Sequence, residues 1–158
     1  MDTNALREIV DTVIREMSAE SDISLNEARV LSKKVREKAA AMGVNAVVAV
    51  SNKSGHPVLV ECMDNAFIAS YDIAVNKAFT VVSLKMSTSA LKPLSQPGGS
   101  LYGIQFTNNG KIVIFGGGEP LKNAKGDVIG GLGVSGGTEE QDTALAEYGK
   151  QIFEKGRI

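Results

Sequence analysis

The sequence predicts an α+β domain in which helices pack on an antiparallel sheet of about five strands, in the order ααββα-βββα. Apolar residues recur at helical spacing through the first 43 residues. Short β-branched runs, separated by polar turns, follow them. Most of the 17 glycines fall between residues 98 and 137, which is typical of strands and tight turns. A length of 158 residues suits one domain over residues 1–158.

Two helices are expected to open the chain, each with a solvated charged face. The second begins at a capping box formed by Ser24 and Glu27 and ends at Gly43. The first can be capped by one of the polar residues at positions 2–4. Its apolar face comprises Leu6, Ile9, Val10, Val13, Ile14 and Met17.

Two further helices are expected later in the chain. The helix from Ser70 to about Lys85 carries Ala74 and Ala78, whose small side chains permit close packing on the sheet. A short helical or irregular segment covers residues 87–94. The last helix runs over about 139–153 and starts at a capping box of Thr138 and Gln141.

Strands are expected over residues 44–51 and 56–63, joined as a hairpin by a polar turn at 52–55. Pro57 cannot donate to a ladder, so it should begin its strand or lie on an edge. A third strand is expected over 111–115, followed by three glycines and Glu119-Pro120-Leu121. A strand over 127–134 then leads into the last helix.

Charge and composition exclude several classes of function. The 17 basic and 18 acidic residues are intermixed, which argues against a nucleic-acid partner. The single cysteine, Cys62, excludes an intrachain disulfide framework and a multi-cysteine zinc site. No apolar run approaches the roughly 20 residues that span a bilayer, and the first thirty residues lack a secretory pattern. We therefore expect a cytoplasmic protein with no membrane partner and no metal site.

A G-x-G-x-x-G motif stands at Gly131, Gly133 and Gly136. A dinucleotide-binding motif needs a following helix and then a second parallel strand, yet only 22 residues remain after Gly136. Three carboxylates in the next helical turn would also repel a phosphate. The glycines are better explained by a turn and by close packing of a helix on a strand.

Several residues could line a ligand pocket. Lys77 lies on an otherwise apolar helical face, where it can extend its ammonium to solvent or point it into a pocket as an anion ligand. Asp64 and Asn65 follow a strand and could supply polar groups to the same place. Residues 116–118 are glycines, which would either cradle a ligand with backbone amides or form a bulge.

The sequence contains no recognisable catalytic constellation. His56 is the only histidine and lies beside a turn, where a surface residue competes with a general base or metal ligand. Cys62 alternates with apolar strand residues, which is typical of a buried, inert thiol rather than a nucleophile. A hydrolytic triad or zinc enzyme is therefore poorly supported, and catalytic residues stay unknown.

Together these segments resemble the GlcG/HbpS-like family, which is related to the C-terminal domain of PduO-type adenosyltransferases and to small proteins of glycolate, glycerol and propanediol utilisation. The most specific part is the block G-V-S-G-G-T-x-x-Q-D, which begins at Gly133. Other parts are Asp64-Asn65-Ala66, Ser70, Ala74, Lys77-Ala78, Thr80, Gly116-Gly117, Pro120 and Val128-Ile129-Gly130.

This resemblance implies a five-stranded antiparallel sheet, compact homo-oligomers such as octamers, and haem as a candidate cofactor. The chain departs from the common Asp-Gly-Ala pattern at Asn65. An axial histidine for haem could come only from His56, with Met63, Met86 or Cys62 as weaker substitutes.

Two main hypotheses about function follow. The first is a non-enzymatic accessory protein that binds a small ligand, haem among the candidates, in diol, glycerol or glycolate metabolism. Its expected site comprises Asp64, Asn65, Lys77, Gly117, Gly118, Glu119, Ser135 and Gly136. The second is an enzyme acting on a small anionic or hydroxylated metabolite, with Lys77 as electrostatic ligand and Asp64 or Glu119 as acid or base. A structural oligomer that binds another protein of the pathway is a third alternative.

Overall fold

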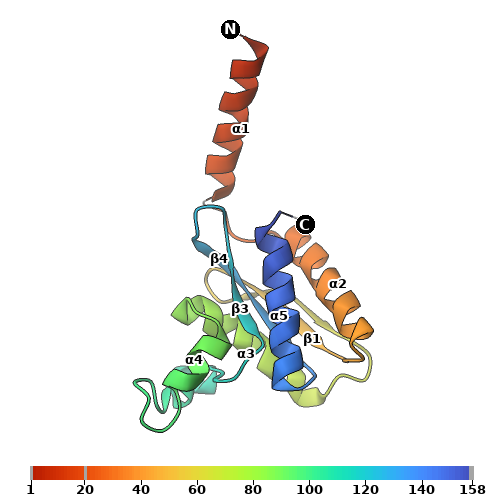
Figure 1. The fold of residues 1–158 in the computed structure, drawn as a ribbon, viewed down its shortest axis with the longest axis vertical. Helices are drawn as coiled ribbons and strands as arrows, with labels where there is room; N and C mark the ends of the chain where they lie inside the picture. Colours follow the sequence, from red (N-terminus) through yellow and green to blue (C-terminus); the bar gives the residue numbers. More distant parts are fainter. Residues whose placement is uncertain (1, 20, 157–158) are drawn as a thin grey trace.

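The computed structural model describes residues 2–19 and 21–156, and shows an α+β architecture built on a four-stranded antiparallel sheet (Figure 1). The strands lie in the order β2-β1-β4-β3. They are β1 (Val47–Asn52), β2 (Pro57–Cys62), β3 (Gly118–Lys122) and β4 (Val128–Ser135). The helices are α1 (Thr3–Ala19), α2 (Leu25–Ala41), α3 (Ile68–Leu84), α4 (Thr88–Leu94) and α5 (Glu139–Glu154), with short 3₁₀ turns η1 (Ile104–Phe106) and η2 (Asn108–Gly110).

The expectation of about five strands is wrong for the described residues, because the segment 111–115 does not join the sheet. Its backbone is bonded to a side chain of α3 instead. The Thr80 hydroxyl accepts from the amide of Val113 at 3.0 Å and lies 3.2 Å from the carbonyl of Lys111, while its proton has a shorter contact, at 2.7 Å, with the Asn76 carbonyl of its own helix. The Thr80 hydroxyl thus contacts backbone groups that a neighbouring strand would otherwise bond, and this apolar, β-branched segment lies against α3 outside the sheet.

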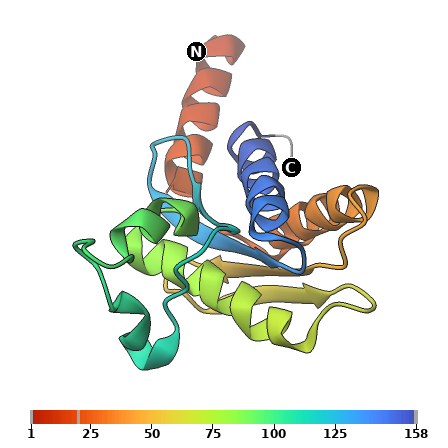
Figure 2. The ribbon, with the colours of Figure 1, turned by 60° about the horizontal axis from the view of Figure 1, so that its bottom comes forward.

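Helices cover both faces of the sheet, α2 and α5 on one and α3 on the other (Figure 2). The α2/α5 face is filled by aliphatic side chains. Its core includes Leu31, Val35, Val48, Val50, Leu121, Leu132, Val134, Leu145 and Ile152. The two predicted capping boxes, at Ser24 and at Thr138, are present and fix where α2 and α5 begin.

The α3 face is packed by close approach of backbones. A Cβ atom added at Gly133 would lie 2.0 Å from the carbonyl oxygen of Ala74, and one at Gly131 would lie 2.4 Å from that of Ala78. Both glycines lie inside β4, so the G-x-G-x-x-G motif does not form a phosphate loop. The prediction that these glycines serve helix-to-strand packing is confirmed.

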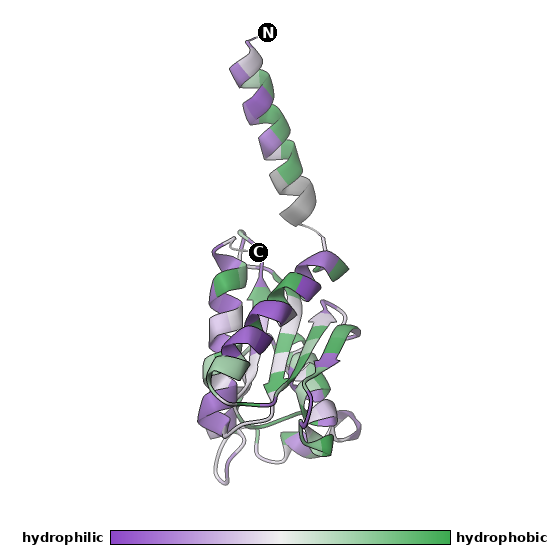
Figure 3. Cartoon of the chain, turned by 90° about the vertical axis from the view of Figure 1, so that its right-hand side faces the viewer, coloured by the Kyte–Doolittle hydropathy of each residue, from purple (hydrophilic) through white to green (hydrophobic). Residues whose placement is uncertain are grey.

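The first helix is present, as predicted, but its apolar face does not pack into the core. Figures 1 and 3 show α1 projecting from the sheet and its covering helices. All of the α1 side chains that are described, up to residue 14, are exposed. Its apolar face is 46–58% exposed at Leu6, Ile9, Val10, Val13 and Ile14, whereas the side chain of Met17 lies outside the described part.

Each of the two edge strands of the sheet contains a proline. Pro57 begins edge strand β2, as predicted, and Pro120 is the third residue of edge strand β3. Within the described residues, no helix has the length and apolar character needed to cross a membrane.

Candidate functional site

Two cavities open at one end of the sheet, where β1 begins and where β2 and β4 end. Val47 of β1 pairs there with Cys62 on one side and Ser135 on the other. The α3 cavity, of about 340 Å³, is lined by Phe67, Ala69, Ser70, Ile73, Phe115, Ser135, Gly136, Gly137, Glu139 and Asp142. The α2 cavity, of about 570 Å³, is lined by Arg36, Asn45, Glu61, Cys62, Met63, Asp64 and Asn65. They adjoin, because a Cβ atom at Gly136 would lie 2.4 Å from the Asn45 carbonyl oxygen.

The α3 cavity joins a polar floor to an aromatic rim. On the floor, the buried Ser135 hydroxyl donates to the buried Ser70 hydroxyl at 3.2 Å. Phe67 and Phe115 stand at the rim, and Phe67 is 71% exposed. An apolar wall with a few converging polar groups is the usual character of a small-molecule site.

A buried ion pair supports this floor. The Lys77 ammonium has no exposed surface, donates to the Val134 carbonyl at 2.7 Å and contacts Asp142 Oδ2 at 3.1 Å. It also lies 4.9 Å from the centre of the Phe115 ring. The backbone of Gly117 passes so close that an added Cβ would lie 2.5 Å from Nζ. Of the two alternatives for Lys77, extension of its ammonium to solvent is therefore wrong, since the ammonium instead joins α3 to β4 and α5.

Burial opposes charge on both members of this pair. Burial lowers the pKa of Lys77 from its ordinary value, against the attraction of Asp142. Burial likewise raises the pKa of Asp142, opposed by the charge of Lys77 and by backbone hydrogen bonds. One of these is the Gly137 amide, which donates to Asp142 Oδ1 at 2.9 Å. The amides at this helix start are thus engaged by the protein's own carboxylate.

Glu139 closes the α3 cavity from the α4 side. The Gly116 amide donates to its carboxylate at 2.9 Å, and Lys92 pairs with it at 2.5 Å. The hydrogen bond from Gly116, followed by the interaction with Lys92, lowers the pKa of Glu139. This carboxylate is consequently occupied in holding α4 and the 116–118 segment against α5.

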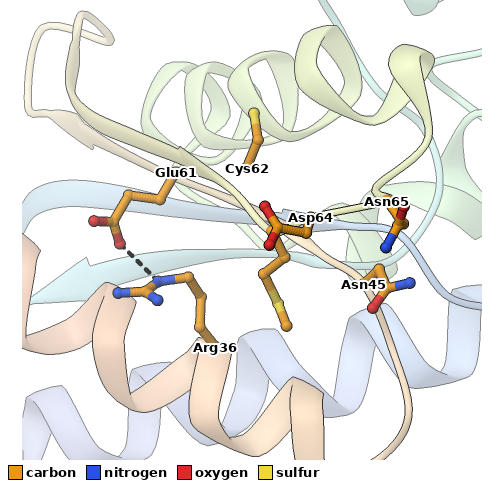
Figure 4. Close-up of a pocket in the computed structure, with 7 residues that line it drawn as sticks. Arg36, Asn45, Glu61, Cys62, Asp64 and Asn65 are labelled. Atoms are coloured by element: carbon orange, nitrogen blue, oxygen red, sulfur yellow. Dashed lines mark hydrogen bonds and ion pairs between the residues drawn. The ribbon is translucent and has the colours of Figure 1, made fainter.

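The α2 cavity is polar. Figure 4 shows Arg36 and Glu61 at one side, Asn45 and Asn65 at the other, and Cys62 turned away from Arg36. Cys62 is exposed, so the expectation of a buried thiol is wrong. Arg36 Nε donates to Glu61 Oε2 at 2.7 Å, and the buried Ser32 hydroxyl donates to the same oxygen at 2.5 Å. This arrangement orients the guanidinium at the cavity wall.

The residues expected to form one site lie in several places. Asp64, Asn65, Ser135 and Gly136 meet at the sheet end. Lys77 and Gly117 lie beneath them, and Gly118 packs against α3, its amide donating to Thr88 Oγ1 at 2.9 Å.

Two of the expected residues lie elsewhere. Glu119 lies on the α5 side, where it pairs with Lys150 at 3.1 Å. Burial raises the pKa of Glu119, against the hydrogen bond and charge of Lys150. His56 is exposed beyond the other end of β1, about 20 Å from the sheet end at the usual rise per strand residue. Among the described residues, no three side chains of the metal-binding types gather to hold an ion.

Sequence reasoning missed several residues around the two cavities: Arg36, Asn45, Phe67, Phe115 and Asp142. For Asp142, the sequence did contain an indication. A lysine on an apolar helical face requires a partner if it is buried, and the carboxylates after Thr138 were candidates.

Comparison with known proteins gives consistent matches over the domain that contains these cavities. The family model described as haem degrading protein HbpS-like matches residues 23–151. An uncharacterised 15.0 kDa protein from the dhaT-dhaS intergenic region of Citrobacter freundii is 45% identical over 83% of this chain and 92% of its own. The corrinoid adenosyltransferase PduO of Salmonella typhimurium is 37% identical over 79% of this chain, which spans 37% of that relative's length. A crystal structure of a PduOC–haem complex superposes with a TM-score of 0.78 at 35% identity, covering 82% of this chain and 94% of that one.

Proposed function

The chain belongs to the HbpS-like family, and from this premise we propose that it is a cytoplasmic, non-enzymatic accessory protein that binds a haem-like ligand in diol, glycerol or glycolate metabolism. The PduOC–haem complex supports the choice of ligand. The relatives from the dhaT-dhaS region and from PduO support the metabolic setting. We propose further that the protein acts as a homo-oligomer.

The α3 cavity is the observation that carries this proposal. Its rim is aromatic at Phe67 and Phe115, and its floor is the hydroxyl pair of Ser70 and Ser135. A flat, largely apolar macrocycle would contact such a rim and expel water from it. The neighbouring α2 cavity offers the guanidinium of Arg36, a group that suits carboxylates.

The residues at the sheet end fit the organic part of haem better than its iron. His56 lies at the far end of the hairpin, and no histidine lines either cavity. Of the sulfur side chains in the α2 cavity, Cys62 is turned away from Arg36, and Met63 Sδ accepts from the Ala46 amide at 3.4 Å. We therefore propose that affinity depends on the α3 cavity and not on ligation by His56.

The enzymatic alternative has little support from the geometry. Lys77 has no exposed surface with which to contact a substrate. Of the two candidate acids or bases, Asp64 lines the α2 cavity, whereas Glu119 is buried on the α5 side and lines neither cavity, and Lys77 lines neither as well. The buried pair is better explained as support for the cavity floor.

Titration of the purified protein with haemin, followed by its absorption spectrum, tests the proposal. We expect a saturable shift of the Soret band in the wild type and in His56→Ala, and at least a tenfold weaker affinity in Ile73→Glu, which places a charge in the α3 cavity. Circular dichroism should confirm that each variant is folded. An unsaturable spectrum with the wild type would exclude haem, and loss of binding in His56→Ala alone would move the site to the hairpin turn.

A further inference from the structure

We propose that α1 is a docking helix, which inserts its apolar side into a groove of a different protein and so attaches the domain to that protein. The groove that fits α1 is apolar along its floor and bordered by lysine or arginine side chains. The part of α1 that would enter it, the docking face, consists of Leu6, Ile9, Val10 and Val13. The docking face lies outside both cavities, so this inference does not depend on the identity of the ligand.

The docking face is apolar and lies in solvent. Its four side chains are 46–54% exposed and follow the i, i+3, i+4, i+7 spacing by which amphipathic helices bind in grooves. Figure 3 shows hydrophobic residues along one side of α1, on a helix that extends away from the sheet. Among the described elements, none packs extensively along α1. An apolar surface of this length in solvent is typical of a contact with another molecule.

The first helix is an addition to the family domain. The HbpS-like match starts at residue 23, where Ile23 is buried and its amide donates to the Ile129 carbonyl at 3.1 Å. The Citrobacter freundii relative matches over 131 residues, which are 92% of its length, so only about 11 of its residues lie outside the match. These are too few for a helix of 17 residues such as α1. The stability of the domain therefore does not explain the apolar side of α1.

The charge of α1 indicates the kind of surface that it would bind. Residues 2–20 contain five acidic side chains and two arginines, which is a net charge of −3. Helices that lie on membranes carry lysine and arginine on their polar side, because these residues are attracted to anionic lipids. An acidic helix would be repelled by such a surface. A protein groove bordered by lysine or arginine would instead attract it.

The length of α1 argues against a bundle of α1 helices from several copies of this chain. A coiled coil needs about three to four heptads, and the 17 residues of α1 fall short of that. A bundle would also bring together several helices with the same net negative charge. A groove avoids both problems, because it surrounds the docking face with side chains from more than one element of the partner.

Hydrogen exchange of the purified protein tests whether copies of the chain cover α1. A helix of this length is marginally stable without packing, so we expect its amides to exchange at the shortest labelling time while those of α2 and α5 stay protected. Val13→Asp should have the same assembly mass by light scattering as its control Thr12→Asp, which adds the same charge beside the docking face. Protection of α1 in the purified protein, or a lower mass in Val13→Asp alone, would assign α1 to a contact between copies and overturn the proposal.

Photo-cross-linking in the cells that make this protein tests for the partner. A small diazirine side chain in place of Val10 should give one discrete adduct with another protein, and the same group in place of Asp11, on the polar side, should give none. The partner, once purified, should bind the wild type and Thr12→Asp equally and Val13→Asp about tenfold more weakly, with an affinity that falls as the salt concentration rises. No adduct, an adduct with this chain alone, or equal affinity for Val13→Asp would overturn the proposal.

Two further measurements separate the docking helix from a membrane anchor and from the ligand site. The wild type should not co-sediment with phosphatidylglycerol vesicles, because both are negatively charged. Co-sedimentation that is lost in Val13→Asp would assign α1 to a lipid surface and overturn the proposal. Val13→Asp should bind haemin as the wild type does, since the docking face lines neither cavity. Weaker haemin binding in Val13→Asp than in Thr12→Asp would assign α1 to the ligand site instead.

Discussion

The two faces of the sheet are held by different means. Large aliphatic side chains of α2, α5 and the strands fill one face, whereas on the other the backbone of α3 lies almost against β4, with alanine opposite glycine. The α3 face also buries a lysine–aspartate pair. The α2/α5 face is therefore stabilised by burial of large apolar side chains. The α3 face is stabilised by close contact between the backbones of α3 and β4 and by one buried ion pair. The α3 cavity lies at the end of this second face.

The largest effect is expected when the buried pair is broken. In Asp142→Ala, the Lys77 ammonium loses its carboxylate while it stays buried, so the free energy of unfolding should fall by about 3–5 kcal/mol. The measurement is chemical denaturation at neutral pH. The double variant Lys77→Met/Asp142→Leu should recover most of the loss, since it leaves no charge without a partner. A single variant as stable as the wild type would mean that the pair does not support this face.

A single added methyl group should be almost as damaging on the same face. The Cβ of Gly133→Ala would lie 2.0 Å from a backbone oxygen of α3, which forces the helix from the sheet. We expect a loss of about 3 kcal/mol in the free energy of unfolding, and weaker haemin binding. Ala144→Leu, which adds more atoms at an exposed position of α5, serves as the control and should change stability by less than about 0.5 kcal/mol.

On the α2/α5 face, the damaging change should be the removal of side-chain atoms from the core. Val35→Ala removes two buried methyl groups from α2, and we expect a loss of about 2 kcal/mol by denaturation. Val13→Ala in the exposed stripe of α1 is the matched control, with a change below about 0.5 kcal/mol. Equal losses in the two variants would mean that the stripe of α1 is covered in solution.

A smaller effect is expected in the pH dependence of the free energy of unfolding. Burial raises the pKa of Glu119 in the folded protein, so the folded state holds this proton more strongly than the unfolded state. The stabilising contribution is present below the ordinary pKa of a glutamate and is lost as pH rises through the raised value. Denaturation at a series of pH values should show this decline in the wild type and a flatter profile in Glu119→Gln. Parallel profiles of stability against pH in the wild type and in Glu119→Gln would contradict the attribution of the decline to Glu119.

The sequence predicted local structure well, because its determinants lie within a few residues. The capping boxes at Ser24 and Thr138 fix helix starts by contacts three residues apart, and both are present. The small residues Ala74 and Ala78 correctly indicated a closely packed helix. Such features need no knowledge of what lies across the sheet.

Features that depend on distant partners were not predictable in the same way. The pattern of α1 predicts an amphipathic helix but contains nothing about what covers its face, and residues 111–115 have strand composition yet bond to a threonine of α3. Lys77 and Asp142 are 65 residues apart, so their pairing follows only from the way α3 and the start of α5 meet at the end of β4. The cavities combine residues from α2, the β2–α3 connection and the end of β4, which explains why part of their lining was missed.

The proline in the middle of β3 limits how copies of this protein can associate. A further strand laid along that edge would find no amide to donate at Pro120. The edge is thus protected against continuous sheet growth of the kind that produces fibrils. Copies that associate through this edge must then rely on side-chain contacts and not on a continuous ladder of backbone hydrogen bonds.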